Sequence, residues 1–72
     1  MNDRFLKSEE RKRIILDLLS SNDFVSIHKV MDQCNVSEIT VRRDLTELES
    51  KGLLIRTHGG AVKSVAGGRL FT

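Results

Sequence analysis

The stretch that decides the fold of this chain runs from Asn35 to Leu48 and reads N-V-S-E-I-T-V-R-R-D-L-T-E-L. Asn35 is of a residue type that tolerates the left-handed conformation in which helices end, and Ser37 is of a type that caps the next helix. After this turn, apolar residues repeat at i, i+4 and i+7, as on one buried helix face: Val41, Leu45 and Leu48. The stretch therefore predicts a short turn followed by a helix that packs on a core.

The face of this helix that points away from the apolar stripe carries Ile39 together with two arginines, Arg42 and Arg43. A helix in water gains nothing from an exposed isoleucine. In the major groove of DNA, guanidinium groups bind guanine or phosphate, and an aliphatic side chain covers a thymine methyl group. The pattern indicates a helix that binds double-stranded DNA, and it leaves open which of the three side chains reads bases. The competing interpretation for Arg43 is an ion pair with Glu47 at i+4.

A first helix is predicted near the N-terminus, where Ser8 is a good N-cap and Glu9 and Glu10 suit the first turn. Its apolar face is broad: Ile14, Ile15, Leu18 and Leu19. The opposite face includes the basic triplet 11–13, which we interpret as solvated, with phosphate contact as the alternative.

A second helix is predicted after Ser26, which is placed to cap it. Its apolar residues share one face: Ile27, Val30, Met31 and Cys34. Cys34 is then a small core residue. The Phe24-Val25 pair before this helix is long enough to add a short strand to a sheet. A short helix, a three-residue turn and a longer helix form a helix-turn-helix.

The period of the pattern changes after Gly52, the residue that is expected to end the third helix near Lys51. Residues 53–57 and 61–64 are predicted as two strands. The segment between them, His58-Gly59-Gly60, supplies the turn, because glycine accepts positive φ. Three helices with a C-terminal β-hairpin wing make a mainly α (α+β) winged helix-turn-helix. We expect this domain to span residues 1–64 and residues 65–72 to be a linker or tail.

Length and charge agree with a small binding domain. The chain has 72 residues, enough for one domain, and a net charge of +2. All ten acidic residues lie at or before Glu49, so the remainder of the chain is locally basic, as a surface that faces phosphate requires.

Other classes of protein are not expected. No paired carboxylates, Ser/His/Asp set or metal-ligand cluster has sensible spacing, so we expect no enzyme, no cofactor and no metal. The single cysteine, Cys34, favours a reducing compartment. The chain has neither an 18-residue apolar run nor the apolar core of a signal peptide, and we expect a cytoplasmic protein without membrane contact.

The block T-V-R-R-D-L at residues 40–45, at its distance from H-G-G-A at residues 58–61, resembles the N-terminal signature of the DeoR family of bacterial repressors. The resemblance covers roughly residues 8–64, with mild departures such as Val41, where the family often has isoleucine. The family's effector domain has no counterpart here. The resemblance implies a repressor of a carbohydrate operon, a phosphorylated sugar as the effector of the absent domain, and a homo-oligomeric intact protein.

On this interpretation the candidate DNA-binding residues share the third helix and the wing: Ser37, Glu38, Ile39, Thr40, Arg42, Arg43, Arg56, His58, Gly59, Gly60 and Lys63. Arg56 and Lys63 are expected to contact phosphate beside the glycine turn. Asp44 would repel phosphate, so we expect it to be structural and to pair with a base of the first helix such as Arg11. The alternative function is a winged helix that binds protein. The two arginines on the third helix argue against it, because a protein-binding face would be expected to be apolar.

Overall fold

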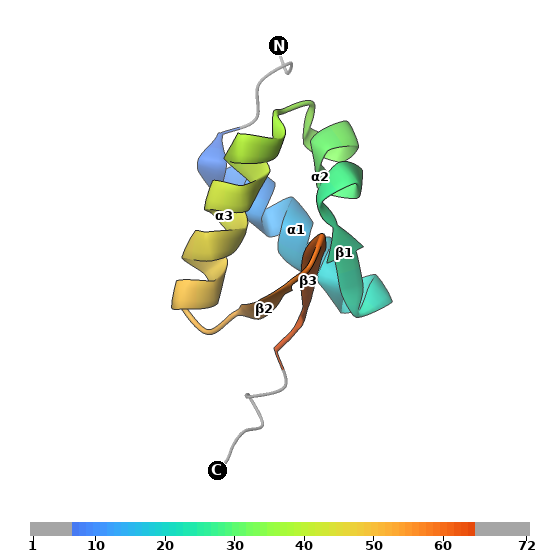
Figure 1. The fold of residues 1–72 in the computed structure, drawn as a ribbon, viewed down its shortest axis with the longest axis vertical. Helices are drawn as coiled ribbons and strands as arrows, with labels where there is room; N and C mark the ends of the chain where they lie inside the picture. The colour runs from blue at the N-terminus through green and yellow to red at the C-terminus, as the bar shows by residue number, and fades with distance from the viewer. Residues whose placement is uncertain (1–6, 65–72) are drawn as a thin grey trace.

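The computed structural model describes residues 7–64, and these residues form three helices and a small sheet. The elements follow one another as α1 (Ser8–Asn22), β1 (Phe24–Ser26), α2 (Ile27–Cys34), α3 (Glu38–Ser50), β2 (Leu54–Thr57) and β3 (Gly60–Lys63). This arrangement confirms the predicted winged helix-turn-helix (Figure 1). The predicted tail at 65–72 lies outside the described residues, so that boundary stays a prediction.

The helix ends follow from local side-chain chemistry. Ser26 Oγ accepts a hydrogen bond from the Lys29 amide at 3.0 Å, and Asn35 ends α2 in the left-handed conformation with φ of 57°. Both features were predicted. The N-cap of α1 was predicted one residue too late, because the helix already includes Ser8. The Lys7 amide instead donates to Glu10 Oε1 at 3.1 Å, so the acid in the first turn stabilises this end.

The sheet has the antiparallel order β1-β3-β2, so the Phe24-Val25 pair does add a third strand, against β3. The predicted turn was one residue too long, since only His58 and Gly59 form it and Gly60 begins β3. A Cβ atom at Gly60 would lie 2.1 Å from the Val25 carbonyl oxygen. Glycine is therefore required at this position for the close approach of β1.

The core lies between the three helices and one face of the sheet, with α1 behind α3 and the sheet in Figure 1. Its buried apolar residues come from every element: Ile15, Leu19, Val25, Ile27, Val30, Cys34, Val41, Leu45, Leu48, Leu54 and Ala61. The predicted stripe of α3 is fully buried. Three other residues that were predicted to be buried pack at the margin and are only partly buried: Ile14, Leu18 and Met31.

A buried ion pair holds α3 on α1. Arg11 Nε donates to Asp44 Oδ2 at 2.5 Å, and Arg11 Nη2 donates to Asp44 Oδ1 at 3.1 Å. The Asp44 side chain is only 1% exposed, so its carboxylate depends on this two-bond contact. The predicted structural role of Asp44 is confirmed. Within residues 7–64, no helix is long and apolar enough to span a membrane.

Candidate nucleic-acid interface

The outward face of α3 presents the side chains that the sequence predicted for DNA. Ile39 is 71% exposed, and it has no share in the core. Arg42 and Arg43 are also exposed, one turn from the start of the helix. An exposed aliphatic side chain between arginines suits contact with base edges in the major groove, where it can cover a thymine methyl group while the arginines bind guanine or phosphate.

The start of α3 is fixed by two hydroxyl groups. Ser37 Oγ accepts a hydrogen bond from the Thr40 amide at 3.4 Å and lies 3.2 Å from Thr40 Oγ1. Ser37 is therefore the predicted cap, and the Thr40 hydroxyl lies within hydrogen-bond distance of it. The remaining amide groups of the first turn and the helix dipole make this end a favourable place for phosphate.

The two arginines of α3 differ in their surroundings. Arg42 contacts Glu38 one turn earlier, through Nε and through Nη2, each 2.7 Å from Glu38 Oε2. The alternative that we considered for Arg43, an ion pair with Glu47, is not formed, because the Glu47 carboxylate binds Lys12 of α1 instead. No ion pair joins Arg43 to another residue of the described part of the chain.

The cations at the start of α1 are used inside the molecule. The hydrogen bond to Asp44 raises the pKa of Arg11 above its ordinary value. The hydrogen bond between Lys12 and Glu47 raises the pKa of Lys12 and lowers that of Glu47. The interpretation of the basic triplet as solvated was therefore wrong for its first two members, which attach α1 to α3.

The turn between β2 and β3 lies beside α3. His58 and Gly59 are exposed, and Gly59 has φ of 87°, which glycine adopts without strain. The Ile27 amide donates to the Gly59 carbonyl at 2.9 Å and so ties the turn to the start of α2. A shallow hollow lies between α3 and the β2–β3 turn, and it is lined by residues of α3, β2 and the turn: Arg42, Arg56, Thr57, His58 and Gly59.

Arg56 braces the wing against α3. Its Nη1 donates to Thr46 Oγ1 at 2.9 Å, and its amide donates to Glu49 Oε2 at 3.1 Å. Arg56 Nε and Thr57 Oγ1 are buried atoms without a hydrogen-bond partner in this structure. Thr57 was missed from the sequence, where it looked like an ordinary strand residue, although its place next to the predicted turn was a usable signal.

Two predicted contacts lie apart from this surface. Gly60 is buried in the sheet under β1, which leaves it unsuited to touch a ligand directly. Lys63 lies at the other end of β3, about 10 Å along the strand from Gly60. Its Nζ is 3.0 Å from Asp23 Oδ1. The structure thus brings together α3 and the turn, and it separates Lys63 from them.

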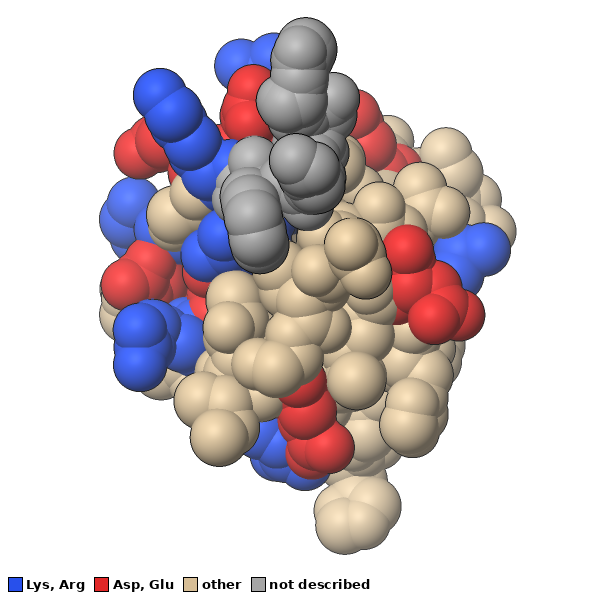
Figure 2. All heavy atoms as spheres, turned by 90° about the horizontal axis from the view of Figure 1, so that it is seen from above, with Lys and Arg blue, Asp and Glu red and all other residues tan. Residues whose placement is uncertain are grey.

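On the face that Figure 2 shows, basic and acidic side chains lie next to one another. Figure 2 shows Lys and Arg interleaved with Asp and Glu on the side that it displays, with no extended patch of one sign. On this face, attraction to phosphate would come from individual cations and helix ends rather than from one extended basic patch.

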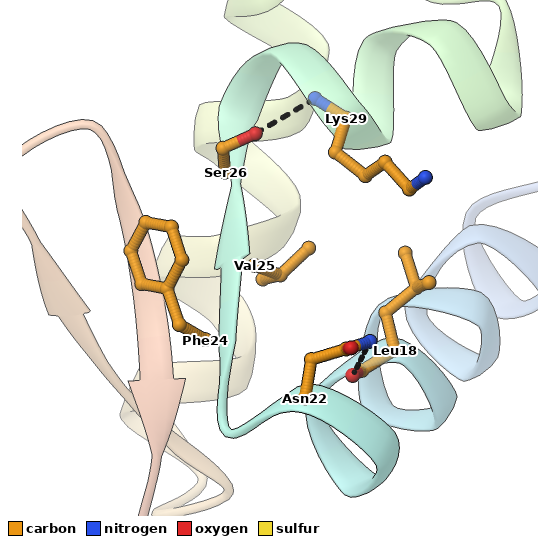
Figure 3. A pocket seen from close by; sticks show the side chains of 6 residues that line it. All are labelled: Leu18, Asn22, Phe24, Val25, Ser26 and Lys29. Carbon is orange, nitrogen blue, oxygen red and sulfur yellow. Dashed lines mark hydrogen bonds between the residues drawn. The ribbon is translucent and has the colours of Figure 1, made fainter.

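Another hollow lies between the end of α1, β1 and the start of α2 (Figure 3). The hydrogen bonds between its lining residues stabilise helix ends. Asn22 Nδ2 donates to the Leu18 carbonyl at 3.0 Å at the end of α1, and the Lys29 amide donates to Ser26 Oγ at the start of α2. The Phe24 ring lies on the β3 side of β1 and the Val25 side chain on the opposite side, toward α1 (Figure 3). This hollow holds no cluster of polar side chains aimed at a ligand.

Comparison with known proteins gives a match to the DeoR-like helix-turn-helix domain over residues 11–64. The chain belongs to this DeoR-like family. It is 48% identical over 60 residues to the HTH-type transcriptional regulator GlpR of Haloferax volcanii, which covers 83% of this chain and 24% of that protein. It is 43% identical over 56 residues to the lactose phosphotransferase system repressor of Lactococcus lactis subsp. lactis, covering 78% of this chain and 22% of that protein.

A third DeoR-like relative is the transcriptional repressor AccR of Agrobacterium fabrum, 43% identical over 58 residues, or 81% of this chain and 22% of that protein. The chain spans about a quarter of the length of these relatives. No solved structure matches the chain at a significant level. Family membership and the geometry of α3 identify the chain as a DNA-binding domain of the transcription-regulator class, with double-stranded DNA as its partner.

Proposed function

We propose that this domain binds an operator in a sequence-specific manner and serves a repressor of a carbohydrate operon. The observation that carries the proposal is the outward face of α3, where an isoleucine that is 71% exposed stands between arginines on a capped helix. Such a face has no role in a folded monomer in water, and it suits the major groove.

In the proposed complex, α3 lies in the major groove with Ile39, Arg42 and Arg43 toward the bases and the adjoining phosphates. Ser37 and Thr40 place the positive end of the helix near one phosphate. The exposed turn of His58 and Gly59 lies against the neighbouring backbone. Of the predicted residues, Arg56 acts by holding this turn, Lys63 contacts phosphate only at the margin, and Gly60 is left out of the interface.

The test is fluorescence anisotropy of the chain with duplex DNA from upstream of its own operon, compared with a scrambled duplex. Arg42→Ala and Arg43→Ala should each weaken operator binding, by about tenfold where the arginine contacts guanine, because such a contact contributes about 1–3 kcal/mol. Arg13→Ala is the matched control, since Arg13 is an exposed arginine on α1, outside the proposed recognition face. Equal binding of operator and scrambled duplex, or full binding by both α3 variants, would refute the proposal.

The wider biology is proposed from the relatives. One relative is named a lactose phosphotransferase system repressor, which supports a phosphorylated sugar as effector. That effector would bind a part of the intact protein that corresponds to the remaining length of those relatives, and the intact protein would be a homo-oligomer in the cytoplasm without enzymatic activity. Two joined domains bind two half-sites and gain effective concentration, so this chain alone should bind less tightly than the intact protein.

The alternative, a winged helix that binds protein, draws on the same exposed Ile39. The two alternatives differ in their response to salt. Binding through phosphate releases counterions, so the affinity for DNA should fall steeply and log-linearly as salt rises. A flat response to salt in the anisotropy titration would favour the protein-binding alternative.

A further inference from the structure

Glu38 and Arg42 form a joined pair of opposite charges at the start of α3. Arg42 Nε and Nη2 are both 2.7 Å from Glu38 Oε2, and the two side chains are 49% and 48% exposed. An exposed pair one turn apart contributes little to folding. Its position on the face that meets DNA therefore calls for another explanation.

We propose that Glu38 and Arg42 act as one unit that reads a single G·C base pair, while Arg43 contacts phosphate. This inference rests on the proposed function, because it assumes that α3 lies in the major groove. It says which side chains of α3 read a base pair and which contacts phosphate, a question that the sequence alone left open.

The pattern of donors and acceptors supports the assignment of the pair. An arginine side chain has five N–H donors, of which the contact with Glu38 Oε2 uses one on Nε and one on Nη2. The other three remain for guanine O6 and N7. Glu38 Oε1 makes no hydrogen bond to another residue within 7–64, and it is an acceptor for the cytosine amine. Donors followed by an acceptor complement the major-groove edge of G·C, which offers two acceptors followed by a donor.

The dimensions also agree. In a G·C pair, guanine O6 and the cytosine amine are hydrogen-bonded to each other, at about 2.9 Å. Arg42 Nη2 is 2.7 Å from Glu38 Oε2, so the guanidinium and the carboxylate that would face guanine and cytosine are already adjacent. One base pair can therefore engage both side chains without separating them. The contact also limits the rotation of Arg42, so that less freedom is lost when it binds guanine.

The acid makes this unit selective. A carboxylate in the groove repels phosphate and the acceptor atoms of a wrong base, so it weakens binding to DNA in general and permits binding where a cytosine amine is available. Removing this carboxylate should then make binding less selective without making it weaker.

Arg43 has different surroundings. It is exposed, it lies one helical turn after Ile39, and Glu47, the ion-pair partner considered as the alternative, is bound to Lys12. No ion pair joins Arg43 to another residue within 7–64, so its guanidinium is available to a phosphate. Loss of a contact with phosphate weakens binding to all sequences by a similar factor. It also lowers the slope of log affinity against log salt concentration by about one.

The experiment is selection of binding sequences from a pool of random duplexes by the 72-residue chain, followed by anisotropy titrations on the selected duplex and its single-base variants. The variants are Glu38→Gln and Arg43→Ala. Asp17→Asn is the matched control, because it makes the same change of charge at an exposed position of α1, outside the proposed recognition face of α3. Circular dichroism establishes that each variant is folded.

We expect the wild-type chain to select a sequence with one strongly preferred G·C pair. Glu38→Gln should reduce discrimination at that pair by about tenfold, with equal or tighter binding to random DNA. Arg43→Ala should keep the selected sequence, weaken binding to every duplex by a similar factor and lower the salt slope by about one. Asp17→Asn should match the wild type.

An unchanged preference in Glu38→Gln, with the wild type selective, would overturn this inference and leave the proposed function intact. A changed preference in Arg43→Ala with none in Glu38→Gln would reverse the roles and also overturn it. A wild-type chain that selects no sequence would instead refute the proposed function itself.

Discussion

Replacing Arg11 by methionine should strongly destabilise this domain, because Arg11 is half of the buried ion pair that holds α3 on α1. The substitution leaves the Asp44 carboxylate, 1% exposed, without the two hydrogen bonds of 2.5 Å and 3.1 Å that Arg11 donates. Breaking a buried pair in this way costs about 3–5 kcal/mol. A domain of 72 residues has a total stability of about 4–11 kcal/mol, from about 0.05–0.15 kcal/mol per residue. Arg11→Met should therefore lose a large part of the stability of the domain.

The assay is urea unfolding followed by far-ultraviolet circular dichroism, whose helical signal is lost when the domain unfolds. For a small protein the free energy falls by about 1–3 kcal/mol per M urea, so the midpoint should drop by about 2 M. Arg13→Met is the control, because Arg13 is the exposed neighbour on α1 and should unfold with the wild type.

A double-mutant cycle separates the ion pair from packing. In the double variant, Arg11→Met with Asp44→Leu, no buried charge is left, and an apolar replacement of a buried pair is often neutral or stabilising. The double variant should therefore recover most of the stability that Arg11→Met alone loses. Two results would refute the reasoning. One is a loss of unfolding free energy below about 1 kcal/mol in Arg11→Met, and the other is a double variant whose loss equals the sum of the losses of Arg11→Met and Asp44→Leu.

Three further predictions concern other parts of the fold. Gly60→Ala should cost about 3 kcal/mol in urea unfolding because its Cβ would lie 2.1 Å from a carbonyl oxygen of β1, whereas Gly59→Ala should cost only about 1 kcal/mol for positive φ; equal losses would contradict the packing argument. Since Lys12 lowers the pKa of Glu47, their contact stabilises above the ordinary glutamate pKa, and that contribution is lost as pH falls through the lowered pKa; acid unfolding of Lys12→Met should lack this part of the pH dependence. Burial raises the pKa of the Cys34 thiol, so iodoacetamide should react with native protein far more slowly than with protein in urea, and equal rates would show that the site is open.

The order of elements follows directly from the sequence, because periodicity and capping are local. The stripe of Val41, Leu45 and Leu48, the cap at Ser37 and the left-handed Asn35 were all predicted and are all present. The errors at element ends also have local causes. The N-cap of α1 shifted because a glutamate in the first turn stabilises the helix start in place of a serine side chain.

Pairing of charges could not be predicted with the same certainty, because it depends on which helices are neighbours. Glu47 has Arg43 at i−4 on its own helix, yet it binds Lys12 from α1. Arg56 was expected to face phosphate, but its guanidinium reaches Thr46 of α3. Sequence spacing shows only the partners on one helix, and tertiary contacts add competitors that spacing does not reveal.

The sequence by itself determined that this chain forms a helix-turn-helix with a wing and that the outward face of α3 carries Ile39, Arg42 and Arg43. The helices and this face follow from the 3.6-residue period, and the wing follows from the change of period after Gly52. Only the tertiary structure decided which cations remain available to DNA. Packing of α1 and β2 against α3 places carboxylates and hydroxyls beside some basic side chains and leaves Arg43 without an ion-pair partner among residues 7–64. Availability of a charge depends on what lies next to it in space, and that is a property of the packed molecule.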